Sequence, residues 1–472
     1  MKFYNSGLRN KHLNEKKWQI HFVGIGGIGM SGIAEVLKNL GYSVSGSDLH
    51  ETETTRRLIS LGIEVSIGHH SDNIKNASVV VVSSAVGKDN DEVIAAHEAQ
   101  VPVIPRAEML AELARLKHSV LVAGAHGKTT TTSLISGLLS KGGLDPTVVI
   151  GGRVKDIGSN AKMGLGDFFV AEADESDGSF LKLSPTIAVV TNIDREHMEF
   201  FGVMTRLKEA FLEFINKVPF YGLAILCTDN PCVQELLPKI HRRYVTYGIN
   251  NDANFRAVNI AYNGLKTVFE VLHDGESLGA FELPLPGLHN ITNGLAAIAV
   301  ALELEIPLEV IRKSMREFQG IQRRFELKGQ ADGIYFFDDY GHHPTEIKAA
   351  LAAAKTVNRL QNGRLIVLFQ PHRYSRTKDL LTEFYPAFKC VDKLILMDIY
   401  AASERPIDGI GSGLLLKGIR ACGCNAIYIQ DRSDIIAFIE SYLEPGDLFL
   451  TLGAGDVWKL GMDVLMRKSM PN

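Results

Sequence analysis

Residues 119–132 read SVLVAGAHGKTTTT. An apolar, β-branched run is followed by two glycines, a lysine and a series of threonines, and a helical pattern then begins, which predicts a strand, a loop and a helix. Backbone N–H groups and a lysine ammonium in such a loop hold the phosphates of a nucleoside triphosphate, and a threonine hydroxyl can bind Mg²⁺. The loop is a shortened G-x-x-G-K-T, because Val122 stands where the usual loop begins with glycine. The residues expected to line this site are Gly124, Ala125, His126, Gly127, Lys128, Thr129 and Thr130.

Acidic residues follow the next two predicted strands of the same series. One strand ends in FFVAEADESDGSF, which carries Glu172, Asp174, Glu175 and Asp177, and another ends in VVTNIDREHMEFFG, which carries Asp194, Glu196 and His197. Ligands bind at the carboxyl edge of an open α/β sheet, so these groups are expected beside the triphosphate. Carboxylates and an imidazole there suit one or two Mg²⁺ ions. We expect only one or two of the acids to be ligands.

A second glycine turn of different design lies near the N-terminus, in IHFVGIGGIGMSG. Gly24, Gly26 and Gly29 form G-x-G-x-x-G directly after a predicted strand, and Asp48 ends the next strand, where a ribose-binding acid is expected. These features alone favour a dinucleotide-dependent oxidoreductase that binds NAD. The diphosphate of a UDP-sugar satisfies the same physics, so the turn indicates a diphosphate better than it indicates NAD.

The alternation of strands and helices predicts an α/β protein of three domains, since 472 residues exceed what one core usually holds. Residues 1–116 are expected to form a Rossmann-like domain with a parallel sheet, after a flexible leader at 1–18. Residues 117–323 are expected to form a phosphate-loop α/β domain, with a small antiparallel addition at 253–286. Residues 324–472 are expected to form a second Rossmann-like α/β domain.

Composition narrows the class of protein further. Fifty basic and 54 acidic residues give a net charge of −4, which argues against nucleic acid as the main partner. The five scattered cysteines are typical of reduced thiols in the cytoplasm. The leader has no apolar core of a secretory signal, and no stretch is long enough to cross a membrane. A cytoplasmic protein without membrane insertion is therefore expected, as a monomer or a weak homodimer.

Eight motifs together resemble the Mur ligase family over nearly the whole chain after the leader. They are GIGGIGMSG at 24–32, GAHGKTTT at 124–131, EADESD at 172–177, TNIDREHM at 191–198, GLHNITN at 287–293, RRFE at 323–326, DDYGHHPTE at 338–346 and FQPHRYSRT at 369–377. The shortened phosphate loop is normal in that family. The resemblance implies a domain for a UDP-sugar, a central ATPase domain and a C-terminal domain that closes over both.

The resemblance also implies an activity in peptidoglycan precursor synthesis. ATP would phosphorylate the lactyl carboxylate of UDP-N-acetylmuramate, and the amine of L-alanine would attack the acyl phosphate to form an amide. One glycine turn would then bind the UDP end of the substrate, and the other would bind ATP. Three alternatives stay open: a ligase that adds a preformed tripeptide to the same sugar, an NAD-dependent oxidoreductase, and a non-catalytic ATP-gated interaction protein.

Roles for individual residues come from the matching motif positions. The resemblance assigns Lys128 to the γ-phosphate, and it places Thr129, Thr130, Glu172 and His197 at Mg²⁺ and phosphate. Asn290, Asn293, Arg324 and Asp339 match residues of the ATP site. The motifs that approach the reacting carboxylate and the incoming alanine contain His343, His372, Arg373 and Arg376. The candidates for the UDP-sugar are Gly24, Gly26, Gly27, Gly29, Met30, Ser31, Asp48, Ser84 and Arg106.

Overall fold

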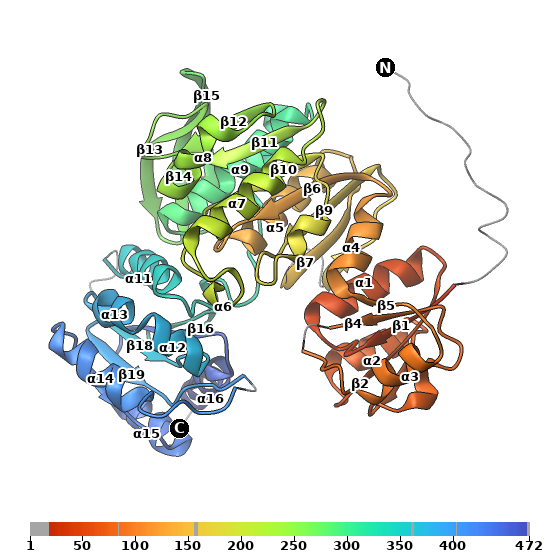
Figure 1. The fold of residues 1–472 in the computed structure, drawn as a ribbon. Coiled ribbons are helices and arrows are strands. Elements are labelled where there is room, and N and C mark those ends of the chain that lie inside the picture. The colour runs from red at the N-terminus through yellow and green to blue at the C-terminus, as the bar shows by residue number, and fades with distance from the viewer. Residues whose placement is uncertain (1–17, 84, 155–158, 360–362, 403, 470–472) are drawn as a thin grey trace. The chain divides into compact units, whose positions relative to one another are not determined.

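The computed structural model describes residues 18–83, 85–154, 159–359, 363–402 and 404–469 (Figure 1). The chain divides into two compact units, residues 1–245 and 246–472. The domain bounds predicted from the sequence, at 116/117 and 323/324, each lie inside one of these units, and they stay predictions.

The first unit begins with a five-stranded parallel sheet of order β3-β2-β1-β4-β5. Its β-branched strands are buried on both faces, as parallel strands covered by helices require; Val80 and Val81 are fully buried. This confirms the predicted N-terminal Rossmann-like sheet. The elements are β1 (Gln19–Val23), α1 (Ile28–Asn39), β2 (Ser43–Asp48), α2 (Glu53–Ser60), β3 (Glu64–Ile67), a 3₁₀ turn (Ser71–Ile74), β4 (Val79–Val82), α3 (Asp91–Glu98), β5 (Val103–Pro105) and α4 (Arg106–Ala114).

A second sheet in the first unit places the phosphate loop between the two acidic loops. Its strands run in the order β11-β10-β6-β9-β7-β8, all parallel except β8, which pairs antiparallel with β7. The strands β9 and β10 flank β6, so the loops after these three strands emerge side by side. The elements are β6 (His118–Ala123), α5 (Lys128–Lys141), β7 (Thr147–Val154), β8 (Ser159–Lys162), β9 (Phe168–Ala173), a 3₁₀ turn (Ser179–Lys182), β10 (Ile187–Val190), α6 (Met198–Phe201), α7 (Met204–Asn216), β11 (Leu223–Cys227), α8 (Pro231–Leu236) and a 3₁₀ turn (Leu237–Lys239).

The second unit starts with the antiparallel addition that the alternating pattern predicts. Strand β12 (Tyr244–Gly248) spans the division between the units, and β13 (Phe255–Asn263), β14 (Lys266–His273) and β15 (Glu276–Leu283) form an antiparallel meander after it. Helices α9 (Leu288–Glu303) and α10 (Leu308–Arg316) pack on the meander. A Cβ on Gly294 of α9 would be 2.9 Å from the terminal methyl of Met315 in α10, and at ordinary contact distance from Phe269 and Leu283 of the meander.

The C-terminal sheet has the order β16-β17-β21-β18-β19-β20, and only β16 is antiparallel to its neighbour. Alternate residues of its strands enter two separate cores: Phe337 and Val367 pack in one, Phe336 and Ile366 in the other. Two covered faces confirm the Rossmann-like prediction. The elements are β16 (Glu326–Ala331), β17 (Ile334–Asp339), α11 (Pro344–Arg359), β18 (Leu365–Phe369), α12 (Tyr374–Asp379), α13 (Leu381–Phe384), a 3₁₀ turn (Tyr385–Phe388), β19 (Lys393–Leu396), α14 (Ser412–Ala421), β20 (Ala426–Tyr428), α15 (Arg432–Tyr442), β21 (Leu448–Leu452) and α16 (Val457–Ser469).

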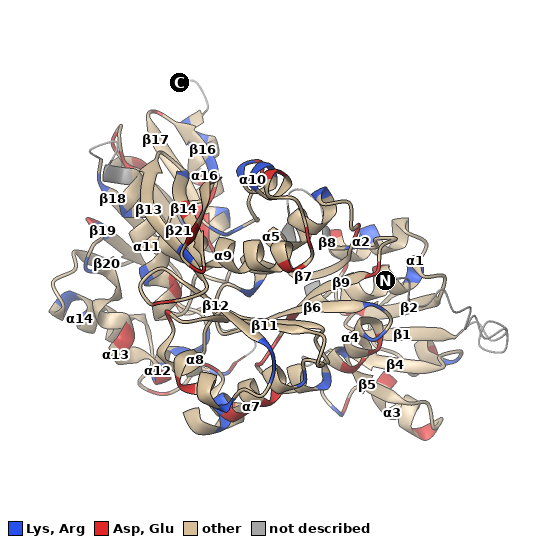
Figure 2. Ribbon diagram, turned by 90° about the horizontal axis from the view of Figure 1, so that it is seen from above, with Lys and Arg blue, Asp and Glu red and all other residues tan. Residues whose placement is uncertain are grey.

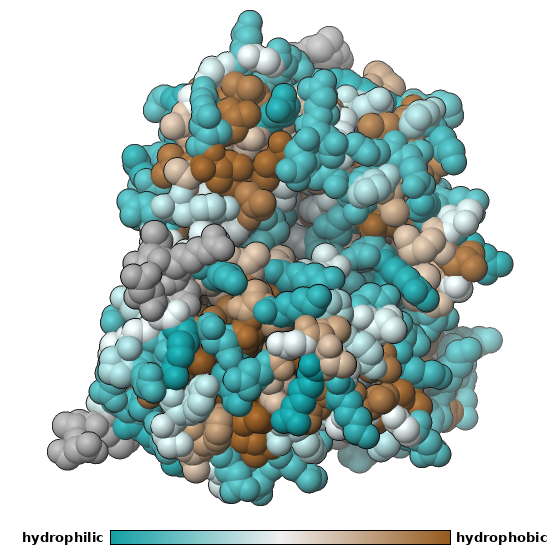
Figure 3. All heavy atoms as spheres, turned by 90° about the vertical axis from the view of Figure 1, so that its left-hand side faces the viewer, coloured by the Kyte–Doolittle hydropathy of each residue, from teal (hydrophilic) through white to brown (hydrophobic). Residues whose placement is uncertain are grey.

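The surface carries both charges, together with exposed large apolar residues such as Leu165 and Phe220. Basic and acidic residues are interspersed along the elements of the chain (Figure 2). The face drawn in Figure 3 is mainly hydrophilic, with hydrophobic residues in small groups. Within the described residues, no helix combines the length and the apolar character needed to cross a membrane.

Candidate active site

The N-terminal glycine turn forms one wall of a cavity of about 560 Å³. Gly24 adopts a φ of +81°, which favours glycine, and its N–H donates to the carbonyl oxygen of Ser47 at 2.9 Å. The N–H of Gly26 donates to Oδ2 of Asp48 at 2.8 Å, and a Cβ at Gly26 would collide with that carboxylate. The predicted turn and the predicted acid therefore meet at one cavity, which His69 and Ser83 also line.

The other predicted sugar-site residues lie in different surroundings. Arg106 begins α4, and its guanidinium occupies the space that a side chain on Gly29 would need. Its Nη2 is 3.5 Å from Oδ2 of Asp174, in the acidic loop after β9. Met30 and Ser31 are buried in α1. Ser84 lies outside the described residues, and Gly27 is the exposed N-cap residue of α1.

The second glycine turn joins β6 to α5. Gly124 and Gly127 adopt φ angles of +136° and +83°, and a side chain on Gly124 would strike Thr191 and Asn192. The side-chain amide of Asn192 holds the loop through two hydrogen bonds to the backbone of His126. Its Oδ1 accepts from the N–H of His126 at 2.9 Å, and its Nδ2 donates to the carbonyl oxygen of His126 at 2.9 Å. Thr129 and Thr130 are buried in the first turn of α5. This loop therefore has the backbone arrangement of a phosphate site at a helix N-terminus.

Lys128 is held at the mouth of this loop. Its Nζ donates to the carbonyl oxygen of Gly124 at 2.6 Å and to the two carboxylate oxygens of Glu175 at 3.0 and 2.8 Å. Burial alone would lower the pKa of Lys128, but Glu175 and Asp174 outweigh burial and raise it. The ammonium thus stays charged, as a phosphate-binding lysine must, and it is paired with Glu175.

A carboxylate–imidazole cluster stands beside Lys128. Ligand atoms of Glu175, Glu196 and His197 all lie within 4.8 Å of one another. His197 is the N-cap residue of α6. It adopts a φ of +56°, a strained conformation for a residue other than glycine. Glu172 lies elsewhere: its Oε1 accepts a hydrogen bond from the N–H of Gly151 at 2.8 Å.

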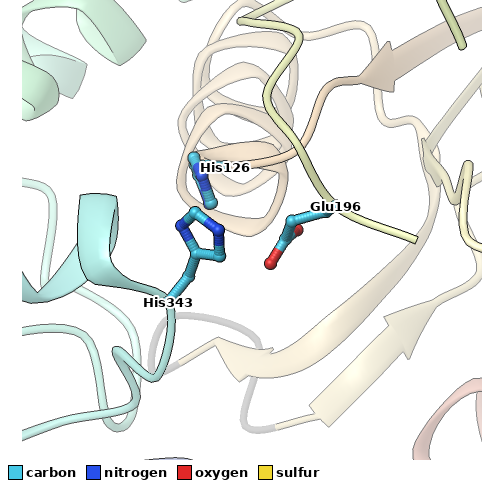
Figure 4. Close-up of side chains that lie close together, drawn as sticks. All are labelled: His126, Glu196 and His343. Atoms are coloured by element: carbon cyan, nitrogen blue, oxygen red, sulfur yellow. The ribbon is translucent and has the colours of Figure 1, made fainter. Parts of the chain in front are cut away.

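The loops that carry these groups are drawn in Figure 4. His126 projects from the phosphate loop and Glu196 from the loop after β10. The His126 Nε2 atom is 3.0 Å from Oδ2 of Asp194. His343, also drawn there, belongs to the second unit. The structure therefore brings His126, Asp194, Glu196 and His197 to one edge of the sheet, as the sequence predicts.

In the second unit, the two predicted asparagines are buried in the first turns of α9. Nδ2 of Asn290 donates to the carbonyl oxygen of Pro286 at 2.8 Å. Gly287 is the N-cap residue of α9. Asn293 is also buried.

Asp339 and Arg324 lie close together near the start of the C-terminal sheet. The Asp339 carboxylate accepts from the N–H groups of Phe325 and Gly341, both at 2.7 Å. Burial raises the pKa of Asp339 to about 6, although the charge of Arg324 opposes the shift. The Arg324 guanidinium lies 5.2 Å from the ring centroid of Tyr340. The adjacent Arg323, which the sequence analysis did not single out, binds Asp338 at 3.0 Å.

Histidines and arginines gather at the carboxyl end of β18. Nη1 of Arg376 is 3.2 Å from Nδ1 of His372, and the ring of Tyr400 stacks on the ring of His372 with centroids 5.6 Å apart. His342 lies beside them, with its ring centroid 5.6 Å from that of His372. Arg373 adopts a φ of +69°. The predicted residues His372, Arg373 and Arg376 are thus together, and His343 is buried at the start of α11.

These histidines lead to a prediction on pH and stability. Burial lowers the pKa of His342 to about 3, and burial together with Arg376 lowers that of His372 to about 4. Burial also lowers the pKa of His289 to about 4. The unfolded chain therefore binds more protons at these sites, so their contribution to stability is complete above pH 6.5 and decreases as the pH falls toward 4. The raised pKa of Asp339 acts in the opposite direction and offsets part of this loss.

Urea denaturation between pH 7 and pH 4 measures the effect. We expect His372→Asn to reduce the slope of unfolding free energy against pH, by up to about 1.4 kcal/mol per pH unit for one proton. Exposed His97→Asn is the control. An unchanged slope in His372→Asn would show that this histidine is charged in the folded state.

Some residues of the site have no motif signal that separates them from their neighbours. Glu175 and Glu196 stand among other acids in EADESD and TNIDREHM, and only their side-chain directions distinguish them. Tyr400 and His69 occur in unremarkable loops. A pattern of charges in sequence places acids at a sheet edge but does not select which of them turn inward.

Comparison with known proteins supplies the class of this protein. Three family models match it: the one described as Mur ligase family, catalytic domain, at residues 19–118, the Mur ligase middle domain at 122–301, and the Mur ligase, glutamate ligase domain at 323–455. The chain belongs to the Mur ligase family, which confirms the resemblance of the motifs.

Individual relatives bear a more specific name. Proteins named UDP-N-acetylmuramate–L-alanine ligase from a Geobacter species and from Desulfosudis oleivorans are 56% and 53% identical to it. The first comparison spans 450 residues, 95% of this chain and 97% of the relative; the second spans 451 residues, 95% and 98%. The crystal structure of UDP-N-acetylmuramate-alanine ligase MurC from Thermotoga maritima is similar with a TM-score of 0.81 and 30% identity, and covers 95% of this chain and 98% of its own.

Proposed function

We propose that this protein is an ATP-dependent ligase that joins L-alanine to the lactyl carboxylate of UDP-N-acetylmuramate. The observation that carries the proposal is the presence of two different phosphate-type glycine turns in one unit, one lining a cavity with Asp48 and the other presenting Lys128 beside a carboxylate–imidazole cluster. Relatives at 53–56% identity bear the name of this activity.

The reaction needs ATP because a carboxylate is a poor electrophile. Transfer of the γ-phosphoryl group to a lactyl carboxylate oxygen releases ADP and forms an acyl phosphate. The neutral amine of L-alanine attacks the acyl carbon, and the tetrahedral intermediate expels phosphate as the amide forms and the nitrogen loses a proton. Alignment of the reactants can supply about 7–11 kcal/mol of the barrier, and no covalent intermediate on the protein is needed.

The phosphate loop would act on the first step. Backbone N–H groups at the start of α5 would bind phosphate oxygens, and the Lys128 ammonium, which lies at the same helix start, would bind the group in transfer. On ATP binding, Lys128 would exchange its contact with Glu175 for the γ-phosphate. The Asn290, Asn293, Arg324 and Asp339 side chains of the second unit are proposed to bind ATP as the family motifs imply.

The acidic cluster is a suitable site for Mg²⁺. Glu175, Glu196 and His197 offer two carboxylates and an imidazole whose ligand atoms are near one another, with Thr129 and Thr130 in the adjacent helix turn. When bound, Mg²⁺ would offset negative charge on the phosphates. Compared with the sequence-based set, the proposed ligands keep His197, add Glu175 and Glu196, and leave out Glu172, whose carboxylate accepts from the N–H of Gly151.

The cluster around His372 is suited to the second step. Arg373 and Arg376 offer guanidinium groups that can bind a carboxylate, and alanine brings a free carboxylate to the reaction. Burial and the charge of Arg376 lower the pKa of His372, so its imidazole is neutral at pH 7 and adds no positive charge beside the two arginines. We place this chemistry in the cytoplasm and expect a monomer or a weak homodimer.

A phosphate-release assay with three substrates and Mg²⁺ tests the proposed function. Purified protein is incubated with ATP, Mg²⁺, UDP-N-acetylmuramate and L-alanine, and phosphate release is measured. We expect release to require all of these components and to be much slower when L-alanine is replaced by a preformed tripeptide. No release with L-alanine would refute the proposal, and faster release with the tripeptide would favour the tripeptide-adding alternative. Tight, saturable binding of NADH would revive the oxidoreductase alternative.

A further inference from the structure

A buried carboxylate near the N-terminal cavity has no role in the chemistry above. Glu92 is the second residue of α3, and its side chain is completely buried. Burial alone would raise its pKa, but the nearby His21 imidazole and the hydrogen bonds from Ser47 and Asn73 lower it to about 2, so the group is charged at pH 7. A buried charge destabilises the fold unless it is fully hydrogen-bonded, so the buried Glu92 carboxylate is expected to have a specific role.

Donors from several segments of the N-terminal sheet converge on this carboxylate. Oε2 accepts from Oγ of Ser47 at 2.6 Å, and Oε1 accepts from Nδ2 of Asn73 at 2.5 Å and from the N–H of His70 at 3.3 Å. Two imidazoles also approach Oε2: Nε2 of His21 at 3.6 Å and Nδ1 of His69 at 3.4 Å. His21 is buried inside the sheet, whereas His69 lines the cavity.

The network fixes which edge of the His69 ring is free to bind. The Ser47 hydroxyl gives its hydrogen to Glu92, so its oxygen accepts from Nδ1–H of His69, 2.9 Å away. Protonation at Nδ1 leaves Nε2 of the neutral ring as a hydrogen-bond acceptor. Among the described residues, Nε2 of His69 has no hydrogen-bond partner in the protein.

The order of strands indicates what this acceptor faces. The glycine turn after β1 is the site of the diphosphate, and Asp48 at the end of the adjacent β2 is placed for the ribose. The next strand outward is β3, and His69 follows it by two residues; the intervening Gly68 donates from its N–H to the carbonyl oxygen of Asp48 at 2.8 Å. Phosphate, ribose and base therefore map in order onto the ends of β1, β2 and β3.

We propose that Glu92, acting through Ser47, positions His69 so that its Nε2 accepts the N3–H of the uracil ring. This inference rests on the proposed use of a uridine diphosphate sugar. Uracil has a hydrogen-bond donor at N3, whereas cytosine has an acceptor there. In a cytidine complex, Nε2 of His69 and N3 of cytosine would therefore be two acceptors facing each other. Glu92 is thus a positioning residue, and His69 determines the choice of base.

Nucleotide binding to the full-length chain tests the assignment. Isothermal titration with UDP and with CDP should show a clear preference for UDP in the unmodified protein. Glu92→Gln keeps the size of the side chain but removes the charge, and we expect it to weaken UDP binding about tenfold and CDP binding much less. In turnover assays, Glu92→Gln should raise the KM for the UDP-sugar and leave the KM for ATP unchanged. Exposed Glu98→Gln, at the other end of α3, is the matched control.

A double-mutant cycle separates positioning from a general effect on folding. His69→Ala should lose the same preference for UDP, and adding Glu92→Gln to it should cause little further loss, because the two residues act as one unit. The inference is overturned if the two losses add, or if both variants keep the preference while thermal melting shows them folded. If Glu92→Gln does not fold, the UDP/CDP ratio of the His69→Ala variant decides alone.

The same data distinguish this inference from the proposed function. Normal phosphate release with an unchanged UDP/CDP ratio in His69→Ala overturns only the role of His69. A protein that selects UDP through His69 but releases no phosphate with L-alanine supports the base site, and refutes only the proposed ligase activity.

Discussion

Replacing Lys128 with alanine is expected to lower the turnover number by about a thousandfold or more, the size of effect seen when one preorganised charge is removed from a phosphoryl-transfer site. The Nζ atom is held by Gly124 and Glu175 at the entrance to the phosphate loop, so its position is already set before ATP binds. Phosphate release at saturating ATP, UDP-sugar and L-alanine measures the loss. Near-normal turnover in this variant would count decisively against the assignment of the loop.

The control for that experiment must account for Glu175. This carboxylate is buried, and it loses its ion pair when Lys128 is truncated, which costs about 3–5 kcal/mol for a buried pair. The double variant Lys128→Met, Glu175→Gln removes both charges and should recover thermal stability without recovering turnover. Lys141→Ala, an exposed lysine at the other end of α5, should behave as the unmodified protein.

The three sheets were predictable because each buried strand has a strong apolar signal. SVLVA, LIVLF and LFLTL are continuous apolar runs that belong to central strands, and the structure has them as β6, β18 and β21. Strands β3, β7, β8, β12 and β16 were not predicted. Three of these, EVSI, SNAK and ELKGQA, lie at sheet edges, where one side lacks a neighbour and polar residues are tolerated.

The position of the site was predictable for a topological reason, but the individual ligands were not. Acids that follow β9 and β10 must lie beside the loop after β6, because these strands are its neighbours. Whether an acid faces that loop depends on local backbone direction. Glu172 is still within β9 and is directed to Gly151, whereas Glu175 lies beyond the strand and reaches Lys128.

The Glu92 network could not have been found from sequence. Its members, His21, Ser47, His69 and Asn73, come from four segments that only the folded sheet brings together. A single glutamate near the start of a helix normally indicates a favourable interaction with the helix dipole. Its complete burial is a property of packing, which no local pattern reports.

The structure and the sequence motif differ on which glutamates bind Mg²⁺, and substitution of these glutamates is expected to have the second large effect on turnover. Glu196→Gln is expected to lower turnover at least about a hundredfold at low Mg²⁺, because it replaces a carboxylate ligand with a neutral amide in the cluster that contains Glu175 and His197. Raising Mg²⁺ should restore part of the rate, since weaker binding is offset by mass action. Phosphate release as a function of Mg²⁺ concentration measures both quantities.

Glu172→Gln is the matched comparison, since it makes the same chemical change one strand away. The family motif places Glu172 at the metal, whereas in the structure its carboxylate accepts from the Gly151 N–H. If the cluster of Glu175, Glu196 and His197 is the main Mg²⁺ site, Glu172→Gln should shift the Mg²⁺ dependence much less than Glu196→Gln does. An equal or larger shift in Glu172→Gln would show that this glutamate turns toward the phosphates when ATP and metal bind, and would restore the assignment made from the sequence.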